Sequence, residues 1–127
     1  MKIEHFAINV KQPREMARWY VEHLEMRIVR SMDVAPCTHF LADDSGQVMI
    51  EIYNNPPDEV PDYAKMHPLL LHLAFVSNDP MKDRQKLESA GCTFVEEVKM
   101  KDGSHLIMMR DPWGLALQLC KRGNPMI

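Results

Sequence analysis

Hydrophobic and polar residues alternate along residues 2–10, where Phe6, Ile8 and Val10 face one way and the residues between them face the other. A period of two is the pattern of a β-strand with one buried face. Pro13 then opens a segment whose apolar residues recur at helical spacing, which predicts a helix that covers a sheet. Three more strands are predicted after it, at about residues 26–33, 37–42 and 47–53.

The same order of elements returns in the second half of the chain. A strand-like run is followed by Asp79-Pro80, which suit the N-cap and first turn of a helix, and then by Gly91, which suits its end. Further strands are predicted near residues 93–98, 105–110 and 115–121. We therefore expect one domain over residues 1–127. It consists of a first β-α-β-β-β module over 1–53, a stiff proline-rich connector over 54–68, and a second module over 69–127.

When the sequence is shifted by 67 residues and compared with itself, residues that are able to bind a metal fall at matching positions of the two halves. His5 falls on His72 (72 − 5 = 67), and Glu51 falls on Gln118 (118 − 51 = 67). An internal repeat of this length indicates one supersecondary unit used twice. If the two copies pack about a pseudo-twofold axis, two histidines, one carboxylate and one amide converge on a single point.

The alternation within the strands supports this convergence. Glu51 lies between two isoleucines and Gln118 between two leucines, so these polar residues point away from the apolar face that lies under a helix. A lone inward-facing histidine is usually a satisfied core residue, whereas four matched polar groups are hard to satisfy except through a shared ligand or water. Imidazole and carboxylate ligands suit Zn, Ni, Fe, Co or Mn, and two histidines with one carboxylate leave positions open for substrate.

Composition narrows the classes of protein to which the chain can belong. Its 127 residues carry a net charge of −3 without a basic stripe, which argues against nucleic acid or an anionic membrane as a partner. No apolar run approaches the roughly 20 residues of a membrane span. The strand pattern begins at once, which indicates that no signal peptide is present. An odd number of cysteines without metal-type spacing predicts reduced thiols and a cytoplasmic protein; these are Cys37, Cys92 and Cys120.

The paired modules, the strand-borne histidines and the run Arg110-Asp111-Pro112-Trp113-Gly114 before the last strand resemble the vicinal oxygen chelate superfamily. This superfamily includes glyoxalase I, methylmalonyl-CoA epimerase, extradiol dioxygenases and drug-resistance proteins of the bleomycin and fosfomycin types. The resemblance covers essentially the whole chain. It implies an α+β fold in which two βαβββ modules, related by a pseudo-twofold, form a curved mixed sheet with a concave metal-binding cleft. The metal ligands it implies are His5, Glu51, His72 and Gln118.

The resemblance also implies a function. One residue, Gln118, departs from the family pattern and changes which residue is expected to act as the base. It implies a divalent-metal-dependent lyase or isomerase of the glyoxalase I-like type, in which the metal chelates adjacent substrate oxygens and stabilises an enediolate or enolate. The family usually has Glu where this chain has Gln118, and an amide cannot take a proton. By pseudo-symmetry, Glu51 is the expected catalytic base.

Two alternatives to this function remain open. One is an Fe(II)-dependent extradiol-type dioxygenase at the same residues, and the other is a non-enzymatic protein that binds a small molecule, as drug-resistance members do. A homodimer is expected because sheet edges need covering, with the site within one chain or between two. Cationic side chains that could hold an anionic substrate tail, although such residues most often simply face solvent, are Arg30, Lys99, Lys101 and Arg110.

Overall fold

The computed structural model describes residues 1–47 and 49–126 of the chain. It contains two four-stranded sheets, each accompanied by one helix. The chain divides into two compact units, Met1–Pro61 and Asp62–Ile127, which we call module 1 and module 2. The mixed sheet expected from the sequence is thus present as two sheets, one in each module.

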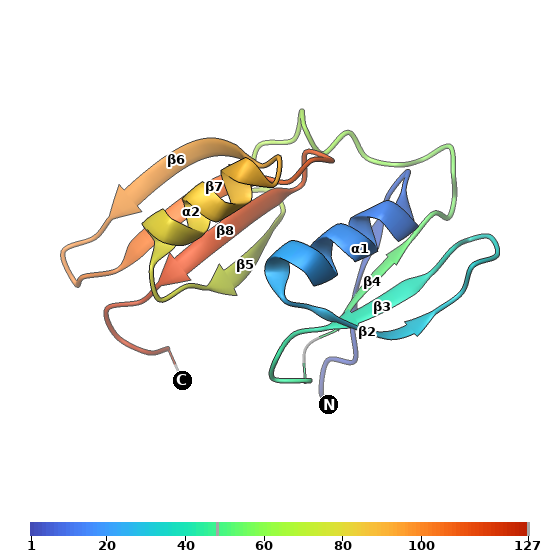
Figure 1. The fold of residues 1–127 in the computed structure, drawn as a ribbon, viewed down its shortest axis with the longest axis horizontal. Coiled ribbons are helices and arrows are strands. Elements are labelled where there is room, and N and C mark those ends of the chain that lie inside the picture. The colour runs from blue at the N-terminus through green and yellow to red at the C-terminus, as the bar shows by residue number, and fades with distance from the viewer. Residues whose placement is uncertain (48, 127) are drawn as a thin grey trace. The chain divides into compact units, whose positions relative to one another are not determined.

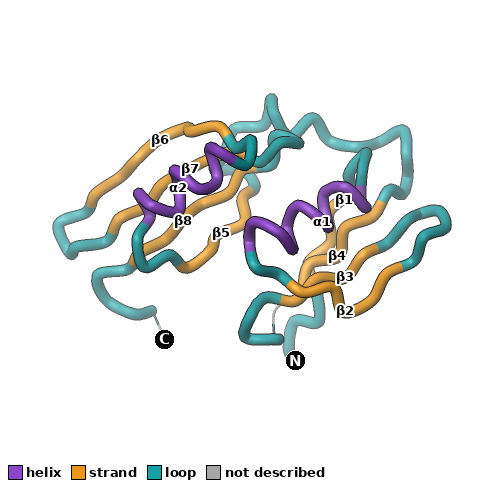
Figure 2. The backbone as a smooth tube through the Cα atoms, in the orientation of Figure 1, coloured by secondary structure: helices purple, strands orange, loops and turns teal. Residues whose placement is uncertain are grey.

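Module 1 follows the predicted order of elements. Its strands are arranged β1-β4-β3-β2, with β1 parallel to β4 and the other pairs antiparallel. Helix α1 lies along one face of this sheet (Figures 1 and 2) and contacts β2, β3 and β4. The fully buried side chains Met16 and Tyr20 of α1, with Leu41 and Ile52 of the sheet, form the core between them. The elements are β1 (Phe6–Asn9), α1 (Pro13–Leu24), β2 (Arg27–Ser31), β3 (His39–Ala42) and β4 (Met49–Tyr53).

Module 2 repeats this architecture with the strand order β5-β8-β7-β6. Again the first strand is parallel to the last, and the remaining pairs are antiparallel. Helix α2 contacts β6, β7 and β8. The α+β class and the two β-α-β-β-β modules are therefore confirmed. The elements are β5 (His72–Val76), α2 (Pro80–Ser89), β6 (Thr93–Lys99), β7 (His105–Arg110) and β8 (Ala116–Lys121).

Local sequence signals account for the ends of α2. The side chain of Asp79 accepts a hydrogen bond of 3.1 Å from the backbone N–H of Lys82, as an N-cap should. After the last helical residue, Gly91 has a φ of +100°, a conformation that side-chain-bearing residues rarely adopt. Both features were predicted from the sequence.

The turn between β7 and β8 anchors part of the connector within module 2. The backbone N–H of Gly114 donates to the carbonyl of Asp111 at 2.9 Å. Beside it, the guanidinium of Arg110 donates to the carbonyls of Gly114 (2.8 Å), Tyr63 (2.8 Å) and Met66 (2.6 Å). The connector therefore ends as a fixed segment of module 2.

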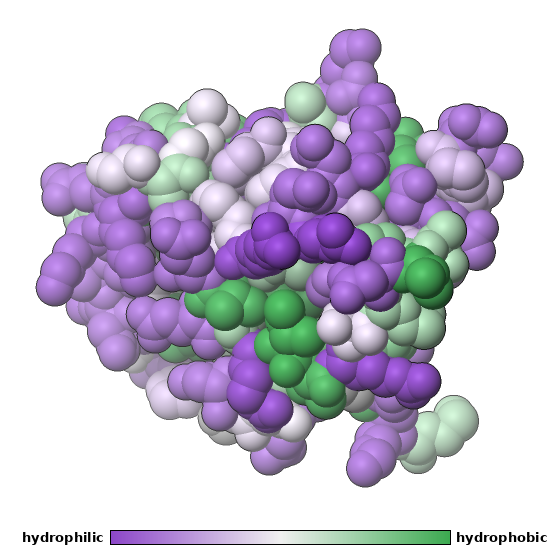
Figure 3. Space-filling view, turned by 45° about the vertical axis from the view of Figure 1, so that its right-hand side comes forward, coloured by the Kyte–Doolittle hydropathy of each residue, from purple (hydrophilic) through white to green (hydrophobic). Residues whose placement is uncertain are grey.

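The cysteines differ in their burial, and some hydrophobic side chains lie at the surface. All three cysteines are free; Cys92 and Cys120 are buried and Cys37 is half-buried. Hydrophobic side chains also reach the surface, and Figure 3 shows a group of them among mainly hydrophilic neighbours. In the part of the chain that the structure describes, no helix has the length and apolar character needed to cross a membrane.

Candidate functional site

In each module one face of the sheet lies under the helix, and we call the opposite one the helix-free face. On this face in module 1 the strand register places Ala7 of β1 beside Glu51 of β4, and Glu51 beside Phe40 of β3. The neighbours of Glu51 in β4, Ile50 and Ile52, are buried on the helix side. Glu51 thus lies on the face that the alternation of its strand predicts.

His5 faces Glu51 across this surface. Its Nε2 lies 3.3 Å from Oε2 of Glu51, and the two side chains are 34% and 21% exposed. The imidazole ring also meets the ring of Phe40 edge-on, with 5.6 Å between centroids. The sequence placed His5 on the first strand, but β1 begins one residue later, at Phe6. His5 nevertheless keeps the side of the sheet that its spacing from Ala7 predicts.

The carboxylate of Glu4 holds the other ring nitrogen of His5. Oε2 of Glu4 contacts Nδ1 of His5. This hydrogen bond is the main reason that the pKa of His5 is raised above its ordinary value of 6.5; the charges of Glu4 and Glu51 add to the effect, and burial opposes it. A metal that binds His5 must displace a proton from the ring at mildly acidic pH.

Module 2 carries the equivalent pair, His72 and Gln118. His72 is the first residue of β5, and Gln118 of β8 lies opposite Ala74, two residues further along β5. This is the relation that His5, Ala7 and Glu51 have in module 1. Nδ1 of His72 lies 3.2 Å from the carbonyl oxygen of Pro68.

The amide of Gln118 has a neighbour that the sequence analysis did not consider. Its Oε1 accepts a hydrogen bond of 3.1 Å from Sγ of Cys120, which lies two residues along the same strand. The sequence spacing of two residues could have predicted this contact, because residues i and i+2 of a strand share a face. This contact orients the amide oxygen toward Cys120.

The types of side chain present, imidazole, carboxylate and amide, are ones that can bind a divalent metal. In both histidines an oxygen of the protein contacts Nδ1, and in His5 the carboxylate of Glu51 faces Nε2. Nε2 is therefore the ring nitrogen that a metal would use. Metal-binding histidines usually have such a partner on the second nitrogen, since it fixes the tautomer and the ring orientation. Within the described residues no three His, Cys, Asp or Glu side chains gather into one cluster. Each module by itself carries one histidine and one oxygen donor of the predicted set.

The comparisons with known proteins agree with this architecture. A family model for the Glyoxalase/Bleomycin resistance protein/Dioxygenase superfamily matches residues 2–119. No curated protein matches the sequence.

Three solved structures with the same fold illustrate the range of the family. A glyoxalase family protein from Bacillus cereus has 16% identity and a TM-score of 0.79, over 96% of this chain and 94% of that one. An antibiotic binding protein from a Streptomyces species has 17% identity and a TM-score of 0.72, over 96% and 98%. A glyoxylase/bleomycin resistance protein/dioxygenase domain from a Frankia species has 17% identity and a TM-score of 0.68, over 96% and 98%. With a family match along nearly its whole length and two modules of the matching fold, the chain belongs to the glyoxalase/bleomycin resistance protein/dioxygenase superfamily.

Proposed function

We propose that this protein is a divalent-metal-dependent lyase or isomerase of the glyoxalase I-like type, acting on a small molecule with two adjacent oxygens. Its metal ligands are His5, Glu51, His72 and Gln118. The observation that supports this proposal is the matched arrangement of the two histidines. Each histidine lies two residues before the strand residue that pairs with an oxygen donor, Glu51 in module 1 and Gln118 in module 2. In each histidine, a protein oxygen also contacts Nδ1. A histidine that merely filled a core would need no such repetition.

The four side chains divide the chemical work between them. A divalent ion such as Zn, Ni, Fe, Co or Mn would supply Lewis acidity to adjacent substrate oxygens on which negative charge develops. His5 and His72 hold the site through Nε2. Gln118 is neutral and takes no proton, so it serves as an oxygen donor that orients the site. Proton transfer falls to Glu51, whose carboxylate lies on the helix-free face and is about one-fifth exposed.

The assembly and location belong to the same proposal. We infer a homodimer, because each module has exposed strands at the edge of its sheet: every residue of β2 and β6 is exposed. The four ligands come from one chain or from two paired chains. Free cysteines in place of disulfides support a cytoplasmic location. The net charge of −3 supports a small-molecule partner rather than nucleic acid or an anionic membrane.

A zinc titration by calorimetry tests the ligand set. The wild-type protein is expected to bind zinc at one ion per four-ligand site, and His5→Ala is expected to weaken binding by roughly a hundredfold or more, since loss of even an outer partner costs about 10- to 100-fold. The matched control is His23→Ala, because His23 belongs to α1 of the same module and its ring contacts Trp19. Equal affinities for wild type and His5→Ala would contradict the proposal.

The reaction class is tested by proton exchange. The zinc-loaded protein is expected to exchange the hydrogen next to the carbonyl of a 2-hydroxycarbonyl compound with D2O, and Glu51→Gln is expected to lose at least 100-fold of that rate. Oxygen consumption by the iron-loaded protein with a catechol would favour the dioxygenase alternative. The fold shared with the Streptomyces antibiotic binding protein favours a binding function as the second candidate. Tight binding of an antibiotic by metal-free protein, without exchange, would support it.

A further inference from the structure

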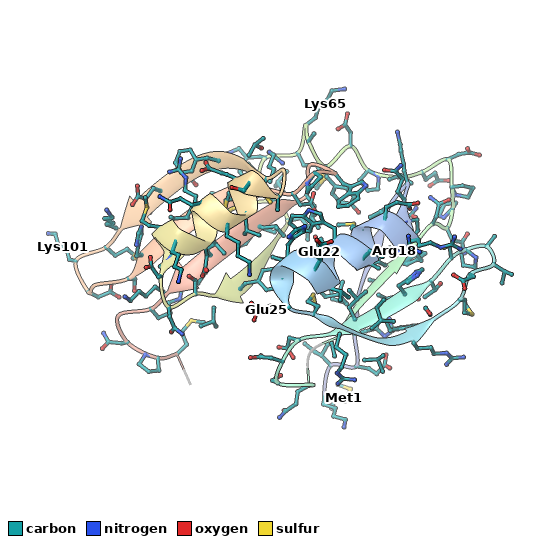
Figure 4. The ribbon with its side chains drawn as sticks, in the orientation of Figure 1. Met1, Arg18, Glu22, Glu25, Lys65 and Lys101 are labelled. Carbon is teal, nitrogen blue, oxygen red and sulfur yellow. The ribbon has the colours of Figure 1, made fainter. Side chains whose placement is uncertain are left out.

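Among the four cationic side chains that the sequence offered for an anionic substrate group, three have other surroundings. The guanidinium of Arg110 donates to backbone carbonyls of its own module. Lys99 forms an ion pair of 3.0 Å with Glu97. Lys101 lies at the tip of the turn after β6 and points out from it (Figure 4). The fourth of these cationic side chains is Arg30.

A β-bulge directs Arg30 toward the helix-free face of module 1. In the pairing of β2 with β3, Ile28 lies opposite Leu41, and Arg30 lies opposite Phe40. Val29 is therefore an extra residue without its own partner in the ladder. In a regular strand Val29 would share the face of Phe40, and Arg30 would point to the helix side. The bulge instead places Arg30 opposite Phe40, and bulges near sites commonly redirect a side chain in this way.

Arg30 consequently belongs to the row of the sheet that contains Glu51. The register runs from Arg30 to Phe40 and from Phe40 to Glu51. Two strand spacings separate Arg30 from Glu51, which is roughly 10 Å between backbones. Phe40 lies between them and also contacts the ring of His5. A ligand that rests on Phe40 would meet the His5–Glu51 pair at one end and Arg30 at the other.

The guanidinium of Arg30 is available to a ligand. Arg30 is exposed, and no described residue forms an ion pair or a hydrogen bond with its side chain. A guanidinium matches carboxylate and phosphate oxygens with two parallel hydrogen bonds, which a hydrated lysine does not. Its positive charge also adds attraction for an anionic molecule in the row of the sheet that contains Glu51.

Module 2 has the same bulge with the opposite charge. There Phe94 lies opposite Met109, and Glu96 lies opposite Met108, which is beside Gln118. Glu96 is thus the repeat equivalent of Arg30. A bulge that served only to protect an edge strand from pairing would need no particular charge at this position. At this place module 1 therefore presents a cation to the helix-free face, whereas module 2 presents a carboxylate.

We propose that Arg30 binds an anionic group of the substrate, a carboxylate or a phosphate, located roughly 5–10 Å from the adjacent oxygens that reach the His5–Glu51 pair. The substrate class is then a small anionic molecule with adjacent oxygens at one end and an acidic group at the other. This inference rests on the proposed function and adds substrate selection to it.

Three hydroxamates that share one chelating group test the role of Arg30 by calorimetry on the zinc-loaded protein. Acetohydroxamate has a neutral tail. Succinic monohydroxamate has a carboxylate and 3-phosphonopropionohydroxamate a phosphonate, each separated from the hydroxamate by two methylene groups. The wild type is expected to bind one of the two acidic probes about tenfold more tightly than acetohydroxamate, as a charge-assisted bidentate contact implies. The acidic probe that binds better identifies the anion. Arg30→Gln is expected to abolish the preference and to leave the zinc content and the acetohydroxamate affinity unchanged.

The pseudo-symmetric variant Glu96→Gln is the matched control. It changes the net charge by the same amount with the opposite sign, at the equivalent position of the other module. Because it removes no cation, the preference for the acidic probe is expected to persist. Retention of the preference in Arg30→Gln would overturn the inference, as would a wild type that binds all three probes equally. Failure of acetohydroxamate to bind the zinc-loaded wild type is a different result. It would refute the chelating site of the proposed function, and the role of Arg30 would fall with it.

Discussion

The Nε2 atom of His5 lies 3.3 Å from Oε2 of Glu51, while Nδ1 of the same ring contacts the carboxylate of Glu4. Each nitrogen of one imidazole therefore has its own carboxylate. Glu51 belongs to the face of the sheet, whereas Glu4 lies in the segment before β1. A substitution of Glu4 therefore changes the surroundings of Nδ1 and leaves the carboxylate that faces Nε2 in place.

Glu4→Gln is expected to shift the pH dependence of zinc binding to lower pH. The hydrogen bond from Glu4 is the largest cause of the raised pKa of His5, so its loss lowers that pKa toward 6.5. Because zinc binds the neutral imidazole, affinity falls as pH drops through the pKa, and a lower pKa moves that fall to lower pH. Zinc titrations between about pH 5.5 and 8 would measure the midpoint.

The matched control for this experiment is Glu22→Gln, on helix α1 of the same module. It removes the same charge elsewhere and should leave the midpoint in place. A midpoint that does not move in Glu4→Gln would show that Glu4 does not govern the protonation of His5.

Gln118→Glu is expected to tighten divalent metal binding by roughly tenfold, because a carboxylate adds charge where the amide offers only a neutral oxygen. The substitution preserves the length of the side chain and its acceptor for Sγ of Cys120. Competition titrations with a chromophoric chelator would measure the change. An affinity equal to that of the wild type would place Gln118 outside the ligand set.

The two strands that carry the candidate oxygen donors, β4 and β8, were predictable because each has one strongly buried face. In β4 and β8 the polar ligand stands between two buried aliphatic residues, as in Ile50-Glu51-Ile52, so the alternation fixes its side. The extent of β1 was less predictable. Alternation over residues 2–10 reports an amphipathic pattern, but a strand also needs a partner, and the pairing of β1 begins with Phe6 opposite Ile50.

The bulge in β2 could not be predicted from the sequence. Arg27-Ile28-Val29-Arg30 fits a regular strand as well as a bulged one, because two adjacent apolar residues leave the face of each arginine undecided. The partner strand decides it, through a register that jumps from Ile28 to Arg30. The contact between Glu4 and His5 was equally hidden, since adjacent residues of a regular strand point to opposite faces.

The three cysteines are expected to react with iodoacetamide at very different rates in the folded protein. Burial raises the pKa of Cys92 to about 12, so at pH 8 only about one thiol in ten thousand is the reactive thiolate. Burial likewise raises the pKa of Cys120. Half-buried Cys37 should therefore be labelled first, and the other two mainly after unfolding in urea. Mass spectrometry of timed samples would show this order, and labelling of Cys92 as fast as Cys37 would contradict it.

Gly114 and Gly103 provide a matched pair that separates backbone strain from crowding. Both have a φ of +87°, and the backbone N–H of each closes a turn on the carbonyl three residues earlier. A Cβ on Gly114 would lie 2.7 Å from the backbone nitrogen of Ala64, whereas the nearest atom to a Cβ on Gly103 is 3.9 Å away.

Gly103→Ala is therefore expected to lower the free energy of unfolding by about 1 kcal/mol, the cost of a left-handed conformation in a residue with a side chain. Gly114→Ala is expected to cost about 2–4 kcal/mol, because the segment around Ala64 must also move. Urea denaturation of the wild type and both variants measures the difference. Equal losses in the two variants would show that the connector yields to the new methyl group, and that the contact between Gly114 and Ala64 does not fix it to module 2.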